Sequence, residues 1–269
     1  MSCEEPSFAT SLMAGGVAGT AVDVALFPLD TLKTRLQSEA GFRASGGFRG
    51  IYSGLGPAAL ASAPNAALFF CTYESMKKLL GSHVPSSYLP GVHMAAASAG
   101  EVVSCIIRVP MEVVKQRRQA QLSHSSIQIV RDVMRKEGPV GLFRGYASTV
   151  MREIPFSLIQ FPVWELLKKT WSEKQGHYVD SWQASLCGAF AGGLSAALTT
   201  PLDVAKTRIM LAHHESITAK GNIKTVLRTV YKQQGLSGLF AGVVPRTLWI
   251  SVGGAVFFGV YEKAKLLFT

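Results

Sequence analysis

Three stretches of the sequence place an acid and a base at fixed distances from a proline. They are "PLDTLKTRLQ" (28–37), "PMEVVKQRRQ" (110–119) and "PLDVAKTRIM" (201–210). In each stretch the acid follows the proline by two positions and the base follows the acid by three, so both charged side chains lie on one face of a helix. Side chains of this kind form ion pairs, within one helix or between helices. The pairs are Asp30 and Lys33, Glu112 and Lys115, and Asp203 and Lys206.

A second acid–base motif follows each proline motif. The stretches "YESMK", "WELLK" and "YEKAK" each contain an aromatic residue, a glutamate and a lysine. Because both motifs occur three times in the same order, the chain consists of three copies of a unit of about ninety residues. We expect these repeats at 1–85, 86–177 and 178–269. The charged residues of the second motif are Glu74 and Lys77, Glu165 and Lys168, and Glu262 and Lys265.

The composition favours a membrane protein. Hydrophobic residues make up 48% of the chain and charged residues 16%, and the mean hydropathy is +0.24. No window is a plain apolar span of about 20 residues, and the first candidate, 12–29, contains Asp23. A charge at membrane depth is tolerated where it faces protein or water. We therefore expect helices that surround a polar interior.

The net charge of +10 does not indicate nucleic-acid binding, because no binding module accompanies it. The basic residues are concentrated in three long stretches between the expected helices. The other connections and the N-terminal tail contain only Lys174. This asymmetry places the three basic stretches on one side of a bilayer.

Each repeat is predicted to contain an apolar helix that ends at the proline motif, a basic connector with a short amphipathic helix, and a second apolar helix. Apolar residues recur at helical spacing in two of the connectors. They are Ile127, Val130, Val133 and Met134 in the second repeat, and Ile223, Val226, Leu227 and Val230 in the third. The fold class is therefore an all-α membrane protein with six transmembrane helices in three pseudo-symmetric two-helix repeats.

The sequence contains no pattern of a metal or cofactor site. The four cysteines have no CxxC spacing, and the six histidines form no HExxH pattern. A methyltransferase would need a glycine-rich loop after a strand, followed by a ribose-binding acid, and no such pattern occurs. The acidic N-terminus lacks the basic region of a secretory signal. We expect no enzyme activity and no cofactor.

The charged residues of the proline motifs have two possible sets of partners. Local pairing within each helix is the simpler interpretation. Around a pseudo-three-fold axis, each acid can instead reach the base of the next helix and close a ring, and the proline favours this by bending its helix toward the axis. Solvated ion pairs contribute roughly 0–1 kcal/mol each. Such a ring could therefore open as a gate. The glutamates and lysines of the aromatic motifs could form a second gate at the opposite membrane face.

Across the whole chain these motifs resemble the mitochondrial carrier family. The family's second signature element is complete only in the middle repeat, as "EGPVGLFRG" (137–145). The resemblance implies alternating access through one central site in the mitochondrial inner membrane, with the proline-motif ring and the amphipathic helices on the matrix side. It also implies glutamines that brace this ring, a role matched by Gln37 and Gln119 but not by Met210. Cardiolipin at the glycine starts of the helices is the implied lipid partner, and we expect a monomer.

The resemblance also implies where a substrate binds. The family's contact positions match Ala61, Arg152 and Trp249, each thirteen positions before the glutamate of its aromatic motif. Other charged residues within or near the spans are candidates for the same site. They are Asp23, Glu101, Arg108, Glu153 and Arg246.

Other roles remain open for some of these candidates. Trp249 could belong to the aromatic belt at a membrane interface, and Arg246 could bind lipid headgroups. Asp23, Glu101 and Arg108 could pair with one another and serve only the scaffold.

Stretches such as "STVMREIPFSLIQFPVWE" (148–165) resemble family members that carry S-adenosylmethionine, which implies exchange of that solute for S-adenosylhomocysteine. S-adenosylmethionine has a sulfonium, an ammonium, a carboxylate and an adenine, so its site needs acids, a base and an aromatic face. The candidate residues supply all of these. A cationic amino acid is an alternative solute, and so is an adenine nucleotide, whose phosphates would need several bases. A purely structural membrane scaffold would not need charges in its spans.

Overall fold

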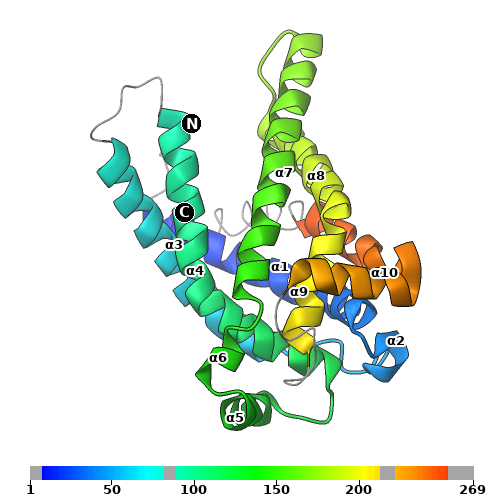
Figure 1. Cartoon of the computed structure of the whole chain (residues 1–269). Coiled ribbons are helices and arrows are strands. Elements are labelled where there is room, and N and C mark those ends of the chain that lie inside the picture. Colours follow the sequence, from blue (N-terminus) through cyan, green and yellow to red (C-terminus); the bar gives the residue numbers. More distant parts are fainter. Residues whose placement is uncertain (1–7, 82–88, 213–221, 254–269) are drawn as a thin grey trace.

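A computed structural model describes residues 8–81, 89–212 and 222–253 of the chain (Figure 1). These residues form helices joined by turns, and no strand occurs among them. The helices are α1 (Phe8–Gln37), α2 (Gly41–Ala44), α3 (Leu55–Gly81), α4 (Leu89–Ala120), α5 (Ser126–Lys136), α6 (Pro139–Leu142), α7 (Tyr146–Gln175), α8 (Ser181–Leu198), α9 (Thr200–Leu211) and α10 (Ile223–Leu239). A further helical segment, Val243–Gly253, follows α10.

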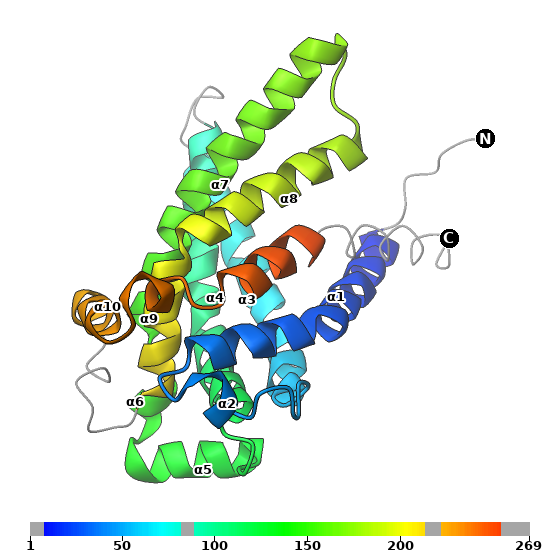
Figure 2. The same ribbon diagram turned by 90° about the vertical axis from the view of Figure 1, so that its right-hand side faces the viewer.

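Neighbouring repeats meet through the second long helix of one and the first of the next. α3 packs along α4, and α7 packs along α8 (Figures 1 and 2). The third repeat returns to the first, since a Cβ on Gly253 would lie 3.4 Å from Leu26 of α1. This cyclic arrangement brings the ends of α1, α4 and α9 together.

Among the residues that the structure describes, two helices are long and apolar enough to cross a membrane on their own, within Leu55–Leu80 and Met94–Ala120. The number rises to four when the bent pairs Trp182–Leu198 with Thr200–Leu211 and Ile223–Leu239 with Val243–Gly253 are each counted as one span. α1 and α7 have 30 residues each, which is long enough to span. Their interior charged residues lower the mean hydropathy of their windows, so a hydropathy test undercounts the spans of this fold.

The proline motif breaks the helix in the third repeat. α8 and α9 meet at Thr199 with a bend of 63°. Pro201, in the first turn of α9, has no N–H to continue the helical ladder. The hydroxyls of Thr199 and Thr200 donate at 2.7 Å to carbonyls one turn earlier, a contact that favours bending. Pro28 and Pro110 lie inside the continuous helices α1 and α4.

The connecting helices differ between the repeats. α10 buries Val226 and Val230 against α9, with Ile223 and Leu227 packed beside them. The first repeat departs from the expected pattern, because α2 has only 4 residues and buries none of them. Its connector contains several glycines at positive φ, a conformation that turns the chain instead of extending a helix.

The second connector forms the predicted short helix, and the neighbouring helices cover only part of its apolar residues. α5 buries Val133 together with Ile129, whereas Ile127, Val130 and Met134 are exposed. The buried side is determined by contact with α4 and α6, through Val114 and Leu142. Helical periodicity shows which apolar residues share a face, but the neighbouring helices decide which face is covered.

A glycine precedes the second long helix of every repeat and packs closely against the next repeat. Gly145, the N-cap of α7, has φ +84°, and a Cβ there would lie 2.9 Å from Cγ of Met210. Gly54 faces the backbone of Lys115 in the same way, and Gly242 faces that of Lys33. Real Cβ atoms essentially never come so close to a neighbour as at Gly145. The glycines therefore let the helix ends of successive repeats approach.

Candidate functional site

The six charged residues of the proline motifs pair between helices and close a ring. Lys33 of α1 lies 2.8 Å from Oδ2 of Asp203 in α9. Lys115 of α4 lies 2.7 Å from Oδ2 of Asp30 in α1, and Lys206 of α9 lies 2.7 Å from Oε1 of Glu112 in α4. Each repeat thus gives one acid to one neighbour and one base to the other. We call these six residues the proline-motif ring.

Two corners of the ring have a glutamine brace. Gln37 donates to Oδ2 of Asp203 at 2.9 Å, and its own oxygen accepts from the Thr207 hydroxyl at 2.7 Å. Gln119 donates to Oδ2 of Asp30 at 3.0 Å. In both cases the glutamine stands four positions after the ring lysine that pairs with the same acid.

The third corner has no glutamine at the matching position, although Gln116, one turn along α4, donates to Oε1 of Glu112 at 3.1 Å. Met210 occupies the corresponding position, is fully buried and packs with Cys105, Val109 and Val113. Oε2 of Glu112, the acid of this corner, is buried without a hydrogen-bond partner among the residues the structure describes. The missing brace therefore coincides with an unsatisfied acceptor.

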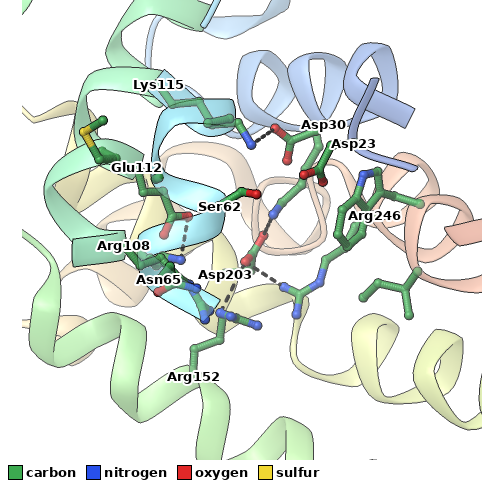
Figure 3. A pocket seen from close by; sticks show the side chains of 17 residues that line it. Asp23, Asp30, Ser62, Asn65, Arg108, Glu112, Lys115, Arg152, Asp203 and Arg246 are labelled. Atoms are coloured by element: carbon green, nitrogen blue, oxygen red, sulfur yellow. Dashed lines mark hydrogen bonds and ion pairs between the residues drawn. The ribbon is translucent and has the colours of Figure 1, made fainter. Parts of the chain in front are cut away.

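A cavity of about 500 Å³ lies above the ring (Figure 3). All six ring residues contribute to its lining. Six of the eight residues predicted to bind substrate also line it, namely Asp23, Ala61, Arg108, Arg152, Arg246 and Trp249. Glu101 and Glu153 do not line it, but both contact an arginine that does.

Arg108 of α4 connects two helices through two glutamates. Its guanidinium contacts Glu101, which lies two turns earlier on the same face of α4. It also lies 2.6 Å from Oε1 of Glu153 in α7. The same Oε1 also accepts from Arg152. Glu101 and Arg108 do pair, as one reading of the sequence allowed, but the described contacts do not include Asp23 in this pair.

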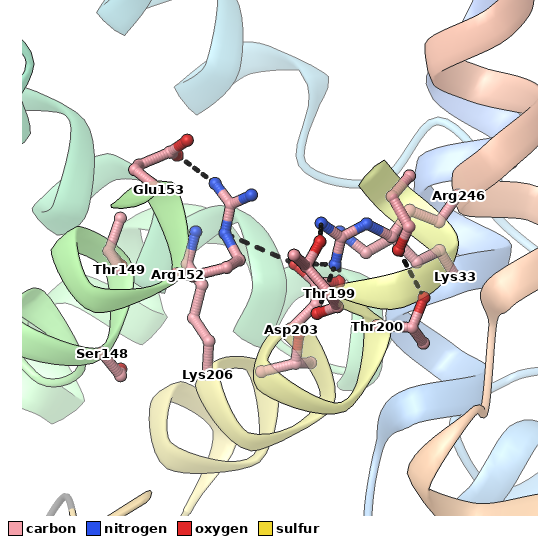
Figure 4. A network of polar contacts seen from close by, with 12 residues as sticks. Lys33, Ser148, Thr149, Arg152, Glu153, Thr199, Thr200, Asp203, Lys206 and Arg246 are labelled. Carbon is pink, nitrogen blue, oxygen red and sulfur yellow. Dashed lines mark hydrogen bonds and ion pairs between the residues drawn. The ribbon is translucent and has the colours of Figure 1, made fainter. Parts of the chain in front are cut away.

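Asp203 joins the ring to the cavity arginines. Its Oδ2 faces Lys33 and Gln37, whereas its Oδ1 lies 3.0 Å from Arg246 and 3.7 Å from Arg152. Figure 4 shows Arg152 on one side of the carboxylate and Arg246 and Lys33 on the other. Three bases therefore share this buried carboxylate. Arg246 is 3% exposed and also donates to Thr199, so it is held inside the protein and not at a lipid surface.

The aromatic motifs pair differently. Lys77 lies 3.3 Å from Glu74, and Lys168 lies 2.8 Å from Glu165, each within one helix. The ammonium of Lys168 also sits over the Trp164 ring at 3.6 Å. The third pair, Glu262 and Lys265, lies outside the described residues.

Several cavity residues were not singled out from the sequence. Ala58, Ser62 and Asn65 of α3 line the cavity together with Ala61. Their spacing of three and four positions puts all of them on one helix face, a signal that counting from Ala61 would have found. Oδ1 of Asn65 is buried without a partner in the described part of the chain. Met111 and Ile250 complete the lining.

One arginine per repeat, two positions after the ring lysine, was also missed. Arg117 lies 2.9 Å from Glu137, the acid of the complete second signature element. Arg208 donates to Oε1 of Gln234 at 2.6 Å instead. Arg35 is fully buried, and within the described part of the chain its guanidinium donates to backbone carbonyls, at distances between 2.6 and 3.2 Å. The equal spacing from Lys33, Lys115 and Lys206 could have identified these positions.

The chain matches the model described as mitochondrial carrier protein over residues 4–47, 41–84, 86–175 and 178–269. The chain belongs to the mitochondrial carrier family. The carrier is 59% identical over 264 residues to a Mus musculus protein named mitochondrial S-adenosylmethionine carrier protein, covering 98% of this chain and 96% of that one. It is 61% identical over 265 residues to the Xenopus tropicalis protein of the same name, covering 98% of both chains. A Saccharomyces cerevisiae protein named putative mitochondrial carrier protein PET8 is 46% identical, over 97% of this chain and 95% of that one.

Family membership settles the class of activity. The carrier is a multi-pass mitochondrial membrane protein that transports a solute, and it is not an enzyme. Its three repeats form the six-helix carrier fold.

Proposed function

We propose that this carrier moves S-adenosylmethionine across the mitochondrial inner membrane, in exchange for S-adenosylhomocysteine, by alternating access to the central cavity. The names of its relatives in mouse and frog support the solute. The observation that carries the proposal is the combination of carboxylates, guanidinium groups and an indole around one cavity. Its volume of about 500 Å³ lies within the range of small-molecule sites.

The substrate groups have complementary partners in the cavity. Arg152 and Arg246 can bind the carboxylate, because guanidinium groups form charge-assisted hydrogen bonds with it. Trp249 offers an aromatic face to the adenine or the cation. Ala61, with its small side chain, leaves room beside them. Glu101, Arg108 and Glu153 hold α4 and α7 together behind the site.

The proline-motif ring acts as the matrix gate in this proposal, with Gln37 and Gln119 as its braces. The ring is closed and lies under the cavity, as expected for a state that is shut toward the matrix. Opening it must break ion pairs between helices. Ligand binding at micromolar affinity contributes about 8 kcal/mol toward opening. The separated groups become solvated on opening and are not left as unpaired buried charges, so each pair costs less to separate than the removal of one of its partners would cost.

The aromatic motifs form the cytosolic-side gate in the opposite state. In the present state Lys77 and Lys168 bind glutamates of their own helices. Closing that gate would require each lysine to leave its local partner for the glutamate of a neighbouring helix. Exposed local pairs are weak, at roughly 0–1 kcal/mol, so this exchange of partners is accessible.

Cardiolipin is the proposed lipid partner, and the carrier is proposed to work as a monomer. Gly54 and Gly145 directly precede α3 and α7, and the first turn of a helix has N–H groups without an intrahelical partner that can bind a phosphate. Neither position carries a side chain that would block a headgroup.

Reconstitution into liposomes tests the proposed function. Vesicles loaded with unlabelled S-adenosylmethionine should take up the labelled compound, and vesicles loaded with S-adenosylhomocysteine should do the same if exchange occurs. A panel of labelled cationic amino acids and adenine nucleotides covers the alternatives. Uptake of one of these in place of S-adenosylmethionine would overturn the proposal.

Two variants control this assay. Arg152→Gln removes a cavity guanidinium and should abolish most of the uptake. Glu173→Gln alters an exposed residue paired only with Lys169 at 3.9 Å and should leave the uptake unchanged. Equal activity of the two variants would argue that the cavity does not bind the transported solute.

A further inference from the structure

The charges around the cavity are not evenly compensated. The lining contains four acids and six bases, and Glu101 and Glu153 add two acids behind it. The total charge is therefore balanced, but its distribution depends on which groups pair. The four lining acids are Asp23, Asp30, Glu112 and Asp203.

Asp23 is the lining acid without a partner. Each of the other three binds a ring lysine at 2.7 or 2.8 Å. No ion pair or hydrogen bond of the Asp23 carboxylate occurs within residues 8–81, 89–212 and 222–253, and no dashed line reaches it in Figure 3. Lys115, the base whose charge acts most strongly on Asp23, is itself bound to Asp30 at 2.7 Å. A half-buried carboxylate thus faces the cavity uncompensated.

The opposite excess lies at Asp203. Lys33, Arg246 and Arg152 all surround this one carboxylate (Figure 4). The cavity therefore has a pole of free negative charge at Asp23 and a pole of excess positive charge at the two arginines. A ligand whose cation is separated from its carboxylate by a short aliphatic chain, as the sulfonium of S-adenosylmethionine is, matches this arrangement.

We infer that Asp23 binds the sulfonium of the substrate and thereby distinguishes S-adenosylmethionine from S-adenosylhomocysteine, an inference that rests on the proposed function. A sulfonium has no N–H to donate, so beside a cation–π contact with an aromatic ring it gains most from a nearby carboxylate whose charge is not already used. Asp23 is such a group. The substrate carboxylate lies at Arg152 and Arg246, where it competes with Asp203 Oδ1.

Glu153 has a structural role and does not bind the sulfonium, although it follows Arg152, a family contact position. Its Oε1 already accepts from both Arg108 and Arg152. Neutralising it would leave two guanidinium groups without their acid and disturb the contact between α4 and α7. Glu153 therefore positions the arginines and does not read the charge of the ligand.

Uptake of two ligands that differ by the sulfonium charge tests this assignment. Labelled S-adenosylmethionine and S-adenosylhomocysteine are given separately to liposomes containing the wild type, Asp23→Asn, Asp23→Glu or Glu153→Gln. Asp23→Asn should lower the uptake rate of S-adenosylmethionine, relative to that of S-adenosylhomocysteine, at least tenfold, which corresponds to about 1.4 kcal/mol. Asp23→Glu keeps the charge and should retain a ratio near that of the wild type. Glu153→Gln should reduce both rates to a similar extent.

Thermal stability gives a second readout that does not depend on turnover. S-adenosylmethionine should raise the melting temperatures of the wild type and of Asp23→Glu. It should raise the melting temperature of Asp23→Asn much less. S-adenosylhomocysteine should stabilise the wild type and Asp23→Asn alike. The melting temperatures without ligand show whether each variant is folded.

The outcomes separate the inference from the proposed function. A wild type that neither transports nor is stabilised by S-adenosylmethionine contradicts both. If the wild type transports S-adenosylmethionine and Asp23→Asn reduces the uptake of both ligands equally, the inference alone is overturned. A change of ratio in Glu153→Gln and not in Asp23→Asn would assign the sulfonium to Glu153 instead.

Discussion

Two sets of acid–base pairs in this carrier have the same spacing in the sequence but different partners in the structure. In both motifs the base follows the acid by three positions. In the proline motifs the bases bind acids of neighbouring helices, whereas in the described aromatic motifs they bind acids of their own helix. The Asp203 side chain is 4% exposed and that of Glu165 is 65% exposed.

The contrast follows from where the helices converge. Close glycine contacts bring the ends of α1, α4 and α9 within reach of one another, so a lysine there can bind across the gap. At the aromatic motifs Glu74 and Glu165 are exposed, and the local pair is the remaining option. Exposed pairs contribute little to stability, and buried pairs are costly to break. The same residue types therefore link neighbouring helices at the proline motifs and only residues of one helix at the described aromatic motifs.

Reversing the charge of Asp203 should have the largest effect. Asp203→Lys places a fourth cation among Lys33, Arg246 and Arg152, and breaking a buried pair costs about 3–5 kcal/mol. Transport in liposomes should be lost and the melting temperature should fall. Glu165→Lys, at an exposed local pair, is the matched control for stability, and its melting temperature should fall far less. Similar losses in the two variants would mean that the ring is not the stronger of the two sets.

A charge exchange at the simplest corner of the ring should restore function. Asp30→Lys and Lys115→Asp should each impair transport, and the double variant should recover part of it, because each described ion pair of these residues is with the other. We expect a coupling energy of about 1–3 kcal/mol from a double-mutant cycle of melting data. Strictly additive losses would contradict inter-helix pairing.

Completing the third brace should stabilise the closed ring. Met210→Gln places an amide at the position that Gln37 and Gln119 occupy at the other corners, and the acid of this corner, Glu112, has an unsatisfied Oε2. Satisfying a buried acceptor should gain about 1 kcal/mol and slow transport. Met210→Leu, which adds no donor, serves as the control. A lower melting temperature for the glutamine variant than for the leucine variant would refute this expectation.

Supplying an acid to Arg208 should give a smaller gain. Gln234→Glu would reproduce the contact that Arg117 makes with Glu137 in the second repeat. Because position 234 is exposed, we expect an increase of about 0.5–1 kcal/mol. Gln233→Glu adds the same charge one position away and should leave the melting temperature unchanged. A gain shared by both variants would point to net charge as the cause.

Removing an exposed local pair should have the smallest effect. Glu74→Gln should change stability by less than about 0.5 kcal/mol in this state. Transport should be more sensitive than stability, because the glutamate is needed for the gate of the opposite state. A large fall in melting temperature would show that Glu74 already serves a structural role here.

The repeat and its motifs are visible in the sequence because they are local patterns. The position of the acid and base after each proline, the glutamines at 37 and 119, and the methionine at 210 need no structure to be recognised. The lining face of α3 and the arginines at 35, 117 and 208 are equally regular and were detectable by their spacing. Helical periodicity also indicated which apolar residues of α10 are buried.

The partners of the charged groups required the tertiary structure. An acid three positions before a base can pair with that base or with a base on another helix. The distance between the helix ends decides which of the two pairs forms. For the same reason the sequence could not show that Arg108 lies between Glu101 and Glu153, or that Asp23 lies apart from every described base that could pair with it. It also could not show that α5 exposes Ile127. Spacing along a helix determines which side chains share a face, but the packing of other helices against that face determines what each side chain meets.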